Sequence, residues 1–371
     1  MNETGGVNRV AFGRSLDGGH TWERSLVEVA TPDQLQSDPW LALDELDRIY
    51  YSRLPFVSRS DDGGLTWGPM VDIHDQPDFA DKGSIQSDGN GTIYESYVNY
   101  GPSAPYNMKI IATRSVDGGV TWGPSRVVVN GLNPFAPAIA SRPNGTAHIV
   151  WWQAVSASRP GGNIMVSTTT DRGLTWGAPV RVNPVRDSAV YFSEPNPKRL
   201  PYPWPATNSG GTLFVAWGDK AKGEYNIDVA RSDDGGATWS APVQVNDTDT
   251  GDQWMAVLAV DANDVLHAAW FDERTGNINL YYANSTDGGR TWSRNLRVTD
   301  QETPAGAHSL GEYLGLAADR NGAAHLVWTD GRDGGSAIYF ARTAGSAPAD
   351  RAAPIRPGSG QGEVRALPPR D

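Results

Sequence analysis

The stretch Ser115-Val116-Asp117-Gly118-Gly119-Val120-Thr121-Trp122 has five further copies along the chain, each of the form Ser/Thr-x-Asp-x-Gly-x-Thr-Trp. We call all six copies boxes; the others span residues 15–22, 60–67, 169–176, 232–239 and 285–292. Six copies with four fixed residue types indicate an internal repeat. Asp-x-Gly predicts a hairpin turn, because Gly tolerates a positive φ and Asp accepts backbone N–H bonds. We therefore interpret the boxes as structural turns and not as catalytic or metal-binding groups.

The spacing of the boxes matches one blade of a β-propeller. Successive box tryptophans are 45, 55, 54, 63 and 53 residues apart, which is the length of a four-stranded blade with long loops. The repeat that ends at Trp292 predicts short strands at 254–261, 265–271, 277–284 and 292–298, with no helical period. We predict an all-β propeller of four-stranded antiparallel blades.

The two ends of the repeat leave the number of blades open. The same four strands are predicted within 38–74, 80–130, 134–183 and 200–246, whereas 314–342 supplies only three before a decayed box at Thr343. At the start, 9–14 and 25–30 read as the third and fourth strands of a blade that lacks its first two. We favour seven repeats with a truncated first one; the alternative is six blades, with 25–30 closing the last. Residues 1–345 then form the propeller, and 346–371 a disordered Pro/Gly-rich tail.

Composition excludes several classes of function. The net charge is −12 with no Lys/Arg cluster, so a nucleic-acid partner is not expected. The absence of cysteine excludes disulfides, thiolate zinc sites and a thiol nucleophile. No apolar run approaches the roughly 18 residues of a membrane span. The first residues also lack the features of a signal peptide.

The boxes resemble those of the Asp-box (bacterial neuraminidase repeat) family, the propellers of sialidases and their relatives, over about residues 9–345. Ser37-Asp38-Pro39-Trp40, Asp252-Gln253-Trp254 and Gly311-Glu312-Tyr313-Leu314 are similar to segments of prokaryotic sialidase-like proteins. The resemblance implies a secreted or cell-surface protein, with a cytoplasmic one as the alternative. We expect a monomer.

The resemblance also implies a set of catalytic groups. Sialidases grip the sialate carboxylate with three Arg side chains, and use a Tyr nucleophile assisted by a Glu and an Asp acid/base. The tripeptides Arg53-Leu54-Pro55 and Arg199-Leu200-Pro201 resemble the motif of the first Arg, and Arg199 is the better placed, ahead of a first strand. The catalytic candidates are Glu312, Tyr313, Glu194 and Asp252.

Binding candidates gather where the first strands of the blades begin. These positions carry Asp38, Asp81, Glu194, Asp252 and Glu312, with Trp254 nearby. Carboxylates and aromatic faces suit sugars; a structural Ca²⁺ ion is an alternative ligand, and acceptance of backbone N–H groups is the purely structural interpretation. No other cofactor is expected, and the histidines show no metal-ligand spacing.

A second recurring pair follows the second strands, with Asp272 before Arg274 and Asp330 before Arg332. Each pair is interpreted as a solvated ion pair or as an arginine that grips an anionic substrate. The function predicted from the sequence is a sialidase-like exo-glycosidase that acts on terminal sugars of glycans at the mouth of the channel. The alternative is a non-catalytic propeller that binds a glycan, protein or cell-surface partner.

Overall fold

The computed structural model describes residues 9–28, 38–75, 79–101, 104, 107–156, 161–185, 188–190, 201–306, 310–311, 313–332 and 334–343. Every regular element in these ranges is a β-strand, as the sequence predicts. The predicted tail at 346–371 lies outside the described residues.

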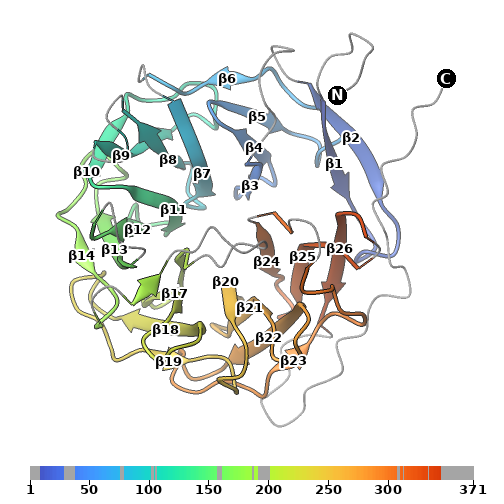
Figure 1. Ribbon diagram of the computed structural model, residues 1–371. Helices are drawn as coiled ribbons and strands as arrows, with labels where there is room; N and C mark the ends of the chain where they lie inside the picture. Colours follow the sequence, from blue (N-terminus) through green and yellow to red (C-terminus); the bar gives the residue numbers. More distant parts are fainter. Residues whose placement is uncertain are drawn as a thin grey trace. The chain divides into compact units, whose positions relative to one another are not determined.

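The strands form six antiparallel sheets in which sequence neighbours pair, and one two-stranded sheet (Figure 1). The two-stranded sheet is β1 (Arg9–Arg14) with β2 (Glu23–Glu28). The sheets of three or more strands begin with β3 (Trp40–Leu43), β4 (Ile49–Arg53), β5 (Phe56–Ser60) and β6 (Val71–Asp72), then β7 (Phe79–Ser87), β8 (Ile93–Tyr100), β9 (Met108–Ser115) and β10 (Arg126–Gly131). The next sheet holds β11 (Pro134–Ser141), β12 (Ala147–Ala154), β13 (Gly161–Thr169) and β14 (Val180–Arg181), with β15 (Ala189–Val190) also paired to β13.

Three further sheets complete the series. They are β16 (Trp204–Thr207), β17 (Leu213–Asp219), β18 (Asn226–Ser232) and β19 (Val243–Gln244); β20 (Gln253–Val260), β21 (Leu266–Asp272), β22 (Asn279–Ser285) and β23 (Leu296–Arg297); and β24 (Leu314–Ala318), β25 (Ala324–Asp330) and β26 (Ala337–Arg342). These six sheets are blades of a β-propeller. Seven repeats are not supported, because β1 and β2 pair only with each other. The closing role of 25–30 is not seen either, because β26 pairs only with β25 among the described strands.

The chain divides into two compact units, which are described separately. Unit 1 comprises residues 1–15, 22–153 and 166–179, and unit 2 comprises 16–21, 154–165 and 180–371. Strands such as β4 and β21 are buried at every position, because both faces of a blade pack against neighbours. Trp217 and Trp270 on second strands are fully buried.

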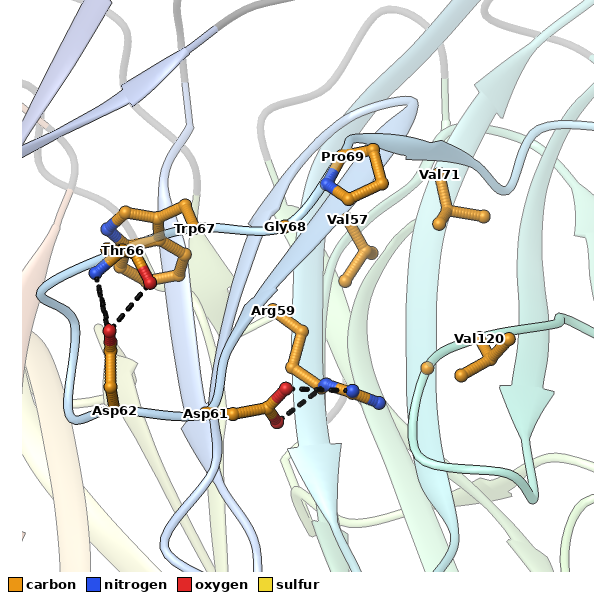
Figure 2. Close-up of a pocket in the computed structure, with 11 residues that line it drawn as sticks. Val57, Arg59, Asp61, Asp62, Thr66, Trp67, Gly68, Pro69, Val71 and Val120 are labelled. Carbon is orange, nitrogen blue, oxygen red and sulfur yellow. Dashed lines mark hydrogen bonds and ion pairs between the residues drawn. The ribbon is translucent and has the colours of Figure 1, made fainter.

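The box turns have the geometry that the sequence predicts. In the box at 60–67, Asp62 Oδ1 accepts the N–H groups of Leu65 and Thr66 at 3.0 and 2.9 Å, and Oδ2 accepts the Thr66 hydroxyl at 2.6 Å (Figure 2). The Thr66 hydroxyl and N–H hydrogen bonds lower the pKa of the Asp62 carboxyl to about 2. The carboxylate of Asp62 is thus engaged in hydrogen bonds within its own turn.

The boxes at 60–67, 115–122 and 169–176 also contact the preceding sheet, through a glycine and through an arginine that the sequence analysis did not single out. Gly64, at φ +85°, packs against the ring of Phe12, where a Cβ would overlap the ring. The arginine just before a box reaches the next box: Arg59 Nη1 donates to the carbonyl of Gly118 at 2.6 Å. Arg14 makes the same kind of bond to the carbonyl of Gly63 at 3.3 Å. This contact joins successive hairpins.

Arg59→Ala is expected to lower the free energy of unfolding by about 1–2 kcal/mol, because it removes a charged donor from the Gly118 carbonyl. Urea unfolding followed by tryptophan fluorescence measures the loss. The matched control is Arg181→Ala, an exposed arginine of β14, which is expected to change stability by less than about 0.5 kcal/mol. Equal losses in the two variants would contradict the role given to Arg59.

Candidate functional site

Two predicted carboxyl groups meet in unit 1, at the starts of the first strands of adjacent sheets. Asp38 precedes β3, and Asp81 lies near the start of β7. Burial, followed by the hydrogen bond and the charge of Asp38, raises the pKa of Asp81 to about 6. The Lys82 ammonium lies 3.8 Å from Asp38 Oδ1, which favours the ionised form of Asp38. Below about pH 6 the pair therefore holds one proton, on Asp81.

The backbone around this pair is in the left-handed region at two residues other than glycine. Asp38 has φ 56° and Lys82 has φ 51°. Lys82 lies in a bulge where the register between β7 and β8 shifts after Asp81. Ala136 in β11 and Met255 in β20 occupy the same kind of bulge, so the bulge belongs to the blade and is not special to β7. Only in β7 does it carry charged side chains, which it directs out of the regular pleat.

Two aromatic residues that the sequence analysis missed complete the cluster. The Tyr100 hydroxyl donates to Asp81 Oδ2 at 3.1 Å. Its ring lies 5.8 Å from that of Phe79, which pairs with Tyr100 across β7 and β8. Phe79 is 71% exposed although it is a large aromatic residue. Phe79 and Asp81 are two residues apart on one strand, and this spacing could have been read from the sequence. The pairing of Phe79 with Tyr100 depends on the register between β7 and β8.

A buried carboxyl group supports the bulge from behind. Glu95 in β8 is fully buried, and its Oε1 accepts the hydroxyl of Ser52 at 2.8 Å. Burial raises the pKa of Glu95 to about 8. A Cβ on Gly83 would lie 2.7 Å from Glu95 Oε1, so only glycine fits here, two residues after Asp81. We call Asp38, Asp81, Lys82, Tyr100 and Phe79 the unit 1 cluster, with Glu95 beneath it.

The other predicted residues lie elsewhere. In unit 2, Asp252 Oδ1 accepts the N–H of Tyr225 at 3.1 Å, which matches the structural interpretation of the acids at strand starts. Tyr313 is half-buried just before β24. The indole of Trp254 is fully buried and stacked on Phe271 with centroids 5.9 Å apart, so it belongs to the core and not to a sugar-binding surface. Glu194, Arg199 and Glu312 lie outside the described residues.

Arg274 and Arg332 take part in a repeated structural arrangement in unit 2. Arg274 Nη2 lies 2.7 Å from Asp272 Oδ2, and its guanidinium covers the ring of Tyr281 at 4.0 Å. Arg332 is likewise 2.6 Å from Asp330 Oδ2 and 4.3 Å above the ring of Tyr339. Both ion pairs are more buried than the solvated surface pairs that the sequence predicts. Their use in gripping a substrate stays a prediction.

A cavity of about 450 Å³ in unit 1 lies between two neighbouring box hairpins and is lined by Trp67, Pro69, Val120 and Arg59 among others (Figure 2). Figure 2 shows Arg59 facing Asp61, with a separation of 2.9 Å between Nε and Oδ1. Asp62, on the same wall, is held by Thr66. The polar groups of this cavity thus serve the turns that form it.

The described residues contain no group of three or more His, Asp or Glu side chains arranged to hold a metal ion. Within the same ranges, no helix has the length and apolar character needed to traverse a bilayer.

Comparison with known proteins defines the class of fold. Neither a protein-family model nor a curated protein matches the chain. A protein of unknown function from Dyadobacter fermentans matches with a TM-score of 0.57 at 15% identity, over 82% of this chain and 93% of that one. The intramolecular trans-sialidase from Ruminococcus gnavus, solved with oseltamivir carboxylate, matches with a TM-score of 0.54 at 13% identity, over 75% and 85%. The Hadza microbial sialidase Hz136 matches with a TM-score of 0.51 at 20% identity, over 81% of this chain and 64% of that one.

These matches show a fold shared with sialidase propellers. They leave the activity of this chain to be argued from its own site.

Proposed function

We propose that this protein is a sialidase-like exo-glycosidase that removes terminal sugars from glycans, with Asp81 as the proton donor. The observation that carries the proposal is the contact between the Asp38 and Asp81 carboxyl groups beside an exposed aromatic ring, which with burial raises the pKa of Asp81 to about 6. A general acid works best when its pKa lies near the working pH, and Asp81 titrates at about 6. The fold likeness to sialidases and the resemblance of the boxes to the Asp-box family support the same class.

The geometry gives each group in the unit 1 cluster a distinct task. Asp81 donates a proton to the glycosidic oxygen of the leaving group, and the Tyr100 hydroxyl holds its carboxyl in place. Phe79 offers an apolar face for a sugar ring. The carboxyl groups of an ordinary glycosidase stand about 5 Å or more apart, whereas Asp38 and Asp81 share a hydrogen bond. Asp38 therefore tunes Asp81 and does not act as the nucleophile.

The catalytic candidates Tyr313 and Asp252 belong to unit 2, and their roles stay predictions from the sequence. We also propose that the protein is secreted or displayed at the cell surface, where glycans are encountered, and that it acts as a monomer.

Asp81→Asn is expected to lower kcat/KM by at least about a hundredfold, because an amide N–H is too weak an acid to protonate the leaving group. Initial rates with a fluorogenic α-sialoside, and with neutral fluorogenic glycosides, measure the effect. The kcat/KM of the unchanged protein should fall as the pH rises through about 6, because Asp81 then loses its proton. Asp47→Asn, at an exposed carboxyl of the same unit, is the matched control and should leave the rate unchanged.

Turnover that is unaffected by Asp81→Asn would contradict the role of Asp81. Absence of turnover on every glycoside, combined with glycan binding that Phe79→Ala abolishes, would favour the non-catalytic propeller. The exposure of the Phe79 side chain is the observation that supports this second function.

A further inference from the structure

A second cavity, of about 460 Å³, lies on the outer part of the β20–β23 sheet in unit 2. It is formed by β22, β23 and the loops that follow β19 and β21. Its lining residues are Asp247, Arg274, Tyr281, Arg294, Asn295, Leu296 and Arg297. Three guanidinium groups therefore line one cavity, and Asp247 is the only carboxylate in the lining.

The first of these arginines is fixed in place. Arg274 donates from Nε to Asp272 Oδ1 at 2.9 Å and from Nη1 to Asp247 Oδ1 at 2.6 Å. The other oxygen of Asp247 accepts the N–H of Asn295 at 3.2 Å. Both oxygens of Asp247 are thus engaged, and Asp247 is held against Arg274 and not against Arg294 or Arg297.

The other two arginines are differently placed. Arg294 is exposed, and its guanidinium makes no hydrogen bond or ion pair with any described residue. Arg297 lies 3.3 Å from Glu302 and donates to the carbonyl of Asp300 at 3.4 Å, and its side chain is 40% exposed. The neighbouring blade shows that the fold does not need them. Counted from the box tryptophans Trp239 and Trp292, the positions of Arg294 and Arg297 correspond to Ala241 and Gln244.

We propose that this cavity binds an oxyanion group, a carboxylate, sulfate or phosphate, of an acidic ligand. Guanidinium groups bind such groups through paired N–H donors. Like charges around one cavity repel each other, and a bound anion removes that repulsion. Asp272 and Asp247 pair with Arg274, and Glu302 pairs with Arg297, so the guanidinium of Arg294 is the group of the lining that no described carboxylate balances. The site is separate from the unit 1 cluster, and it does not depend on the proposed hydrolysis.

Isothermal titration calorimetry with sodium sulfate, at ionic strength held constant with sodium chloride, tests the proposal. The expected result is saturable one-site binding that Arg294→Gln weakens at least tenfold. Because Arg294 is exposed and its guanidinium makes no hydrogen bond or ion pair with any described residue, the variant should fold normally, which circular dichroism checks. Arg231→Gln, an arginine of β18 that pairs with Asp233, is the matched control and should bind sulfate as the unchanged protein does.

A sulfated disaccharide and its unsulfated counterpart, titrated in the same way, separate a saccharide ligand from a free anion. Tighter binding of the sulfated disaccharide than of sulfate, lost in Arg294→Gln, supports an acidic glycan, whereas equal binding supports the free ion. Absence of saturable binding of sulfate, phosphate and sulfated disaccharide overturns the proposal, and so does binding that Arg294→Gln leaves unchanged. Neither outcome alters the test of Asp81.

Discussion

Glu95→Gln is expected to stabilise the protein above neutral pH and to leave its stability near pH 4.5 almost unchanged. The physical reason is the buried carboxyl of Glu95, whose pKa is raised from 4.5 to about 8 by burial. The folded state therefore holds a proton that the unfolded state has lost between these two values. The contribution of Glu95 to the free energy of unfolding is fully present below pH 4.5 and is lost as the pH rises through 8. The loss is up to about 1.4 kcal/mol per pH unit.

The change is measured by urea unfolding at several pH values between 5 and 9. The difference in free energy of unfolding between Glu95→Gln and the unchanged protein should grow with pH, to about 4–5 kcal/mol at pH 8 and above. The exposed Glu45, replaced in the same way, should give a curve parallel to that of the unchanged protein. A constant difference for Glu95→Gln across the range would show that this carboxyl is not held in its neutral form.

Trp270→Ala is expected to cost about 3–5 kcal/mol of unfolding free energy, the range for truncating a large buried aromatic residue. Trp270 is fully buried in the core of unit 2 and stacked on Tyr281, with ring centroids 6.4 Å apart. Its Nε1 also donates to Asp272 Oδ2 at 3.0 Å, so the variant removes a donor from a buried carboxylate.

Trp292→Ala in the same sheet is the informative comparison. Trp292 is a box tryptophan and is half-buried, so we expect a loss of about 1–2 kcal/mol. Urea unfolding of both variants measures the two losses. A loss of unfolding free energy at Trp292 as large as that at Trp270 would show that a half-buried box tryptophan contributes as much to stability as a fully buried one.

The strands could be predicted from local sequence because they depend on local chemistry. The predicted third strand at 277–284 is β22 (Asn279–Ser285), and the predicted first strand at 254–261 is β20 (Gln253–Val260). The predicted fourth strand at 292–298 shortens to Leu296–Arg297, because the outer strand pairs with β22 over only a few residues. The number of blades was not predictable, because it depends on which strands pair at the two ends of the chain.

The candidate site could be predicted only in part. Asp38 and Asp81 were found because each begins a first strand. Their shared proton depends on contact between two sheets, which no spacing within one repeat reveals. Phe79 and Tyr100 were missed because their contact follows from cross-strand register. Trp254 was assigned to the surface because a sequence does not show which face of a strand is covered.

The proposed general acid depends on Asp81 carrying the proton of a carboxyl pair in unit 1. A carbon-13 NMR titration of the Asp81 side-chain carboxyl, assigned by comparison with Asp81→Asn, tests this claim directly. The predicted midpoint is about pH 6, because burial and the neighbouring Asp38 disfavour the ionised form. A midpoint at or below pH 4 would show that Asp81 is an ordinary carboxylate, and would contradict its role as a proton donor.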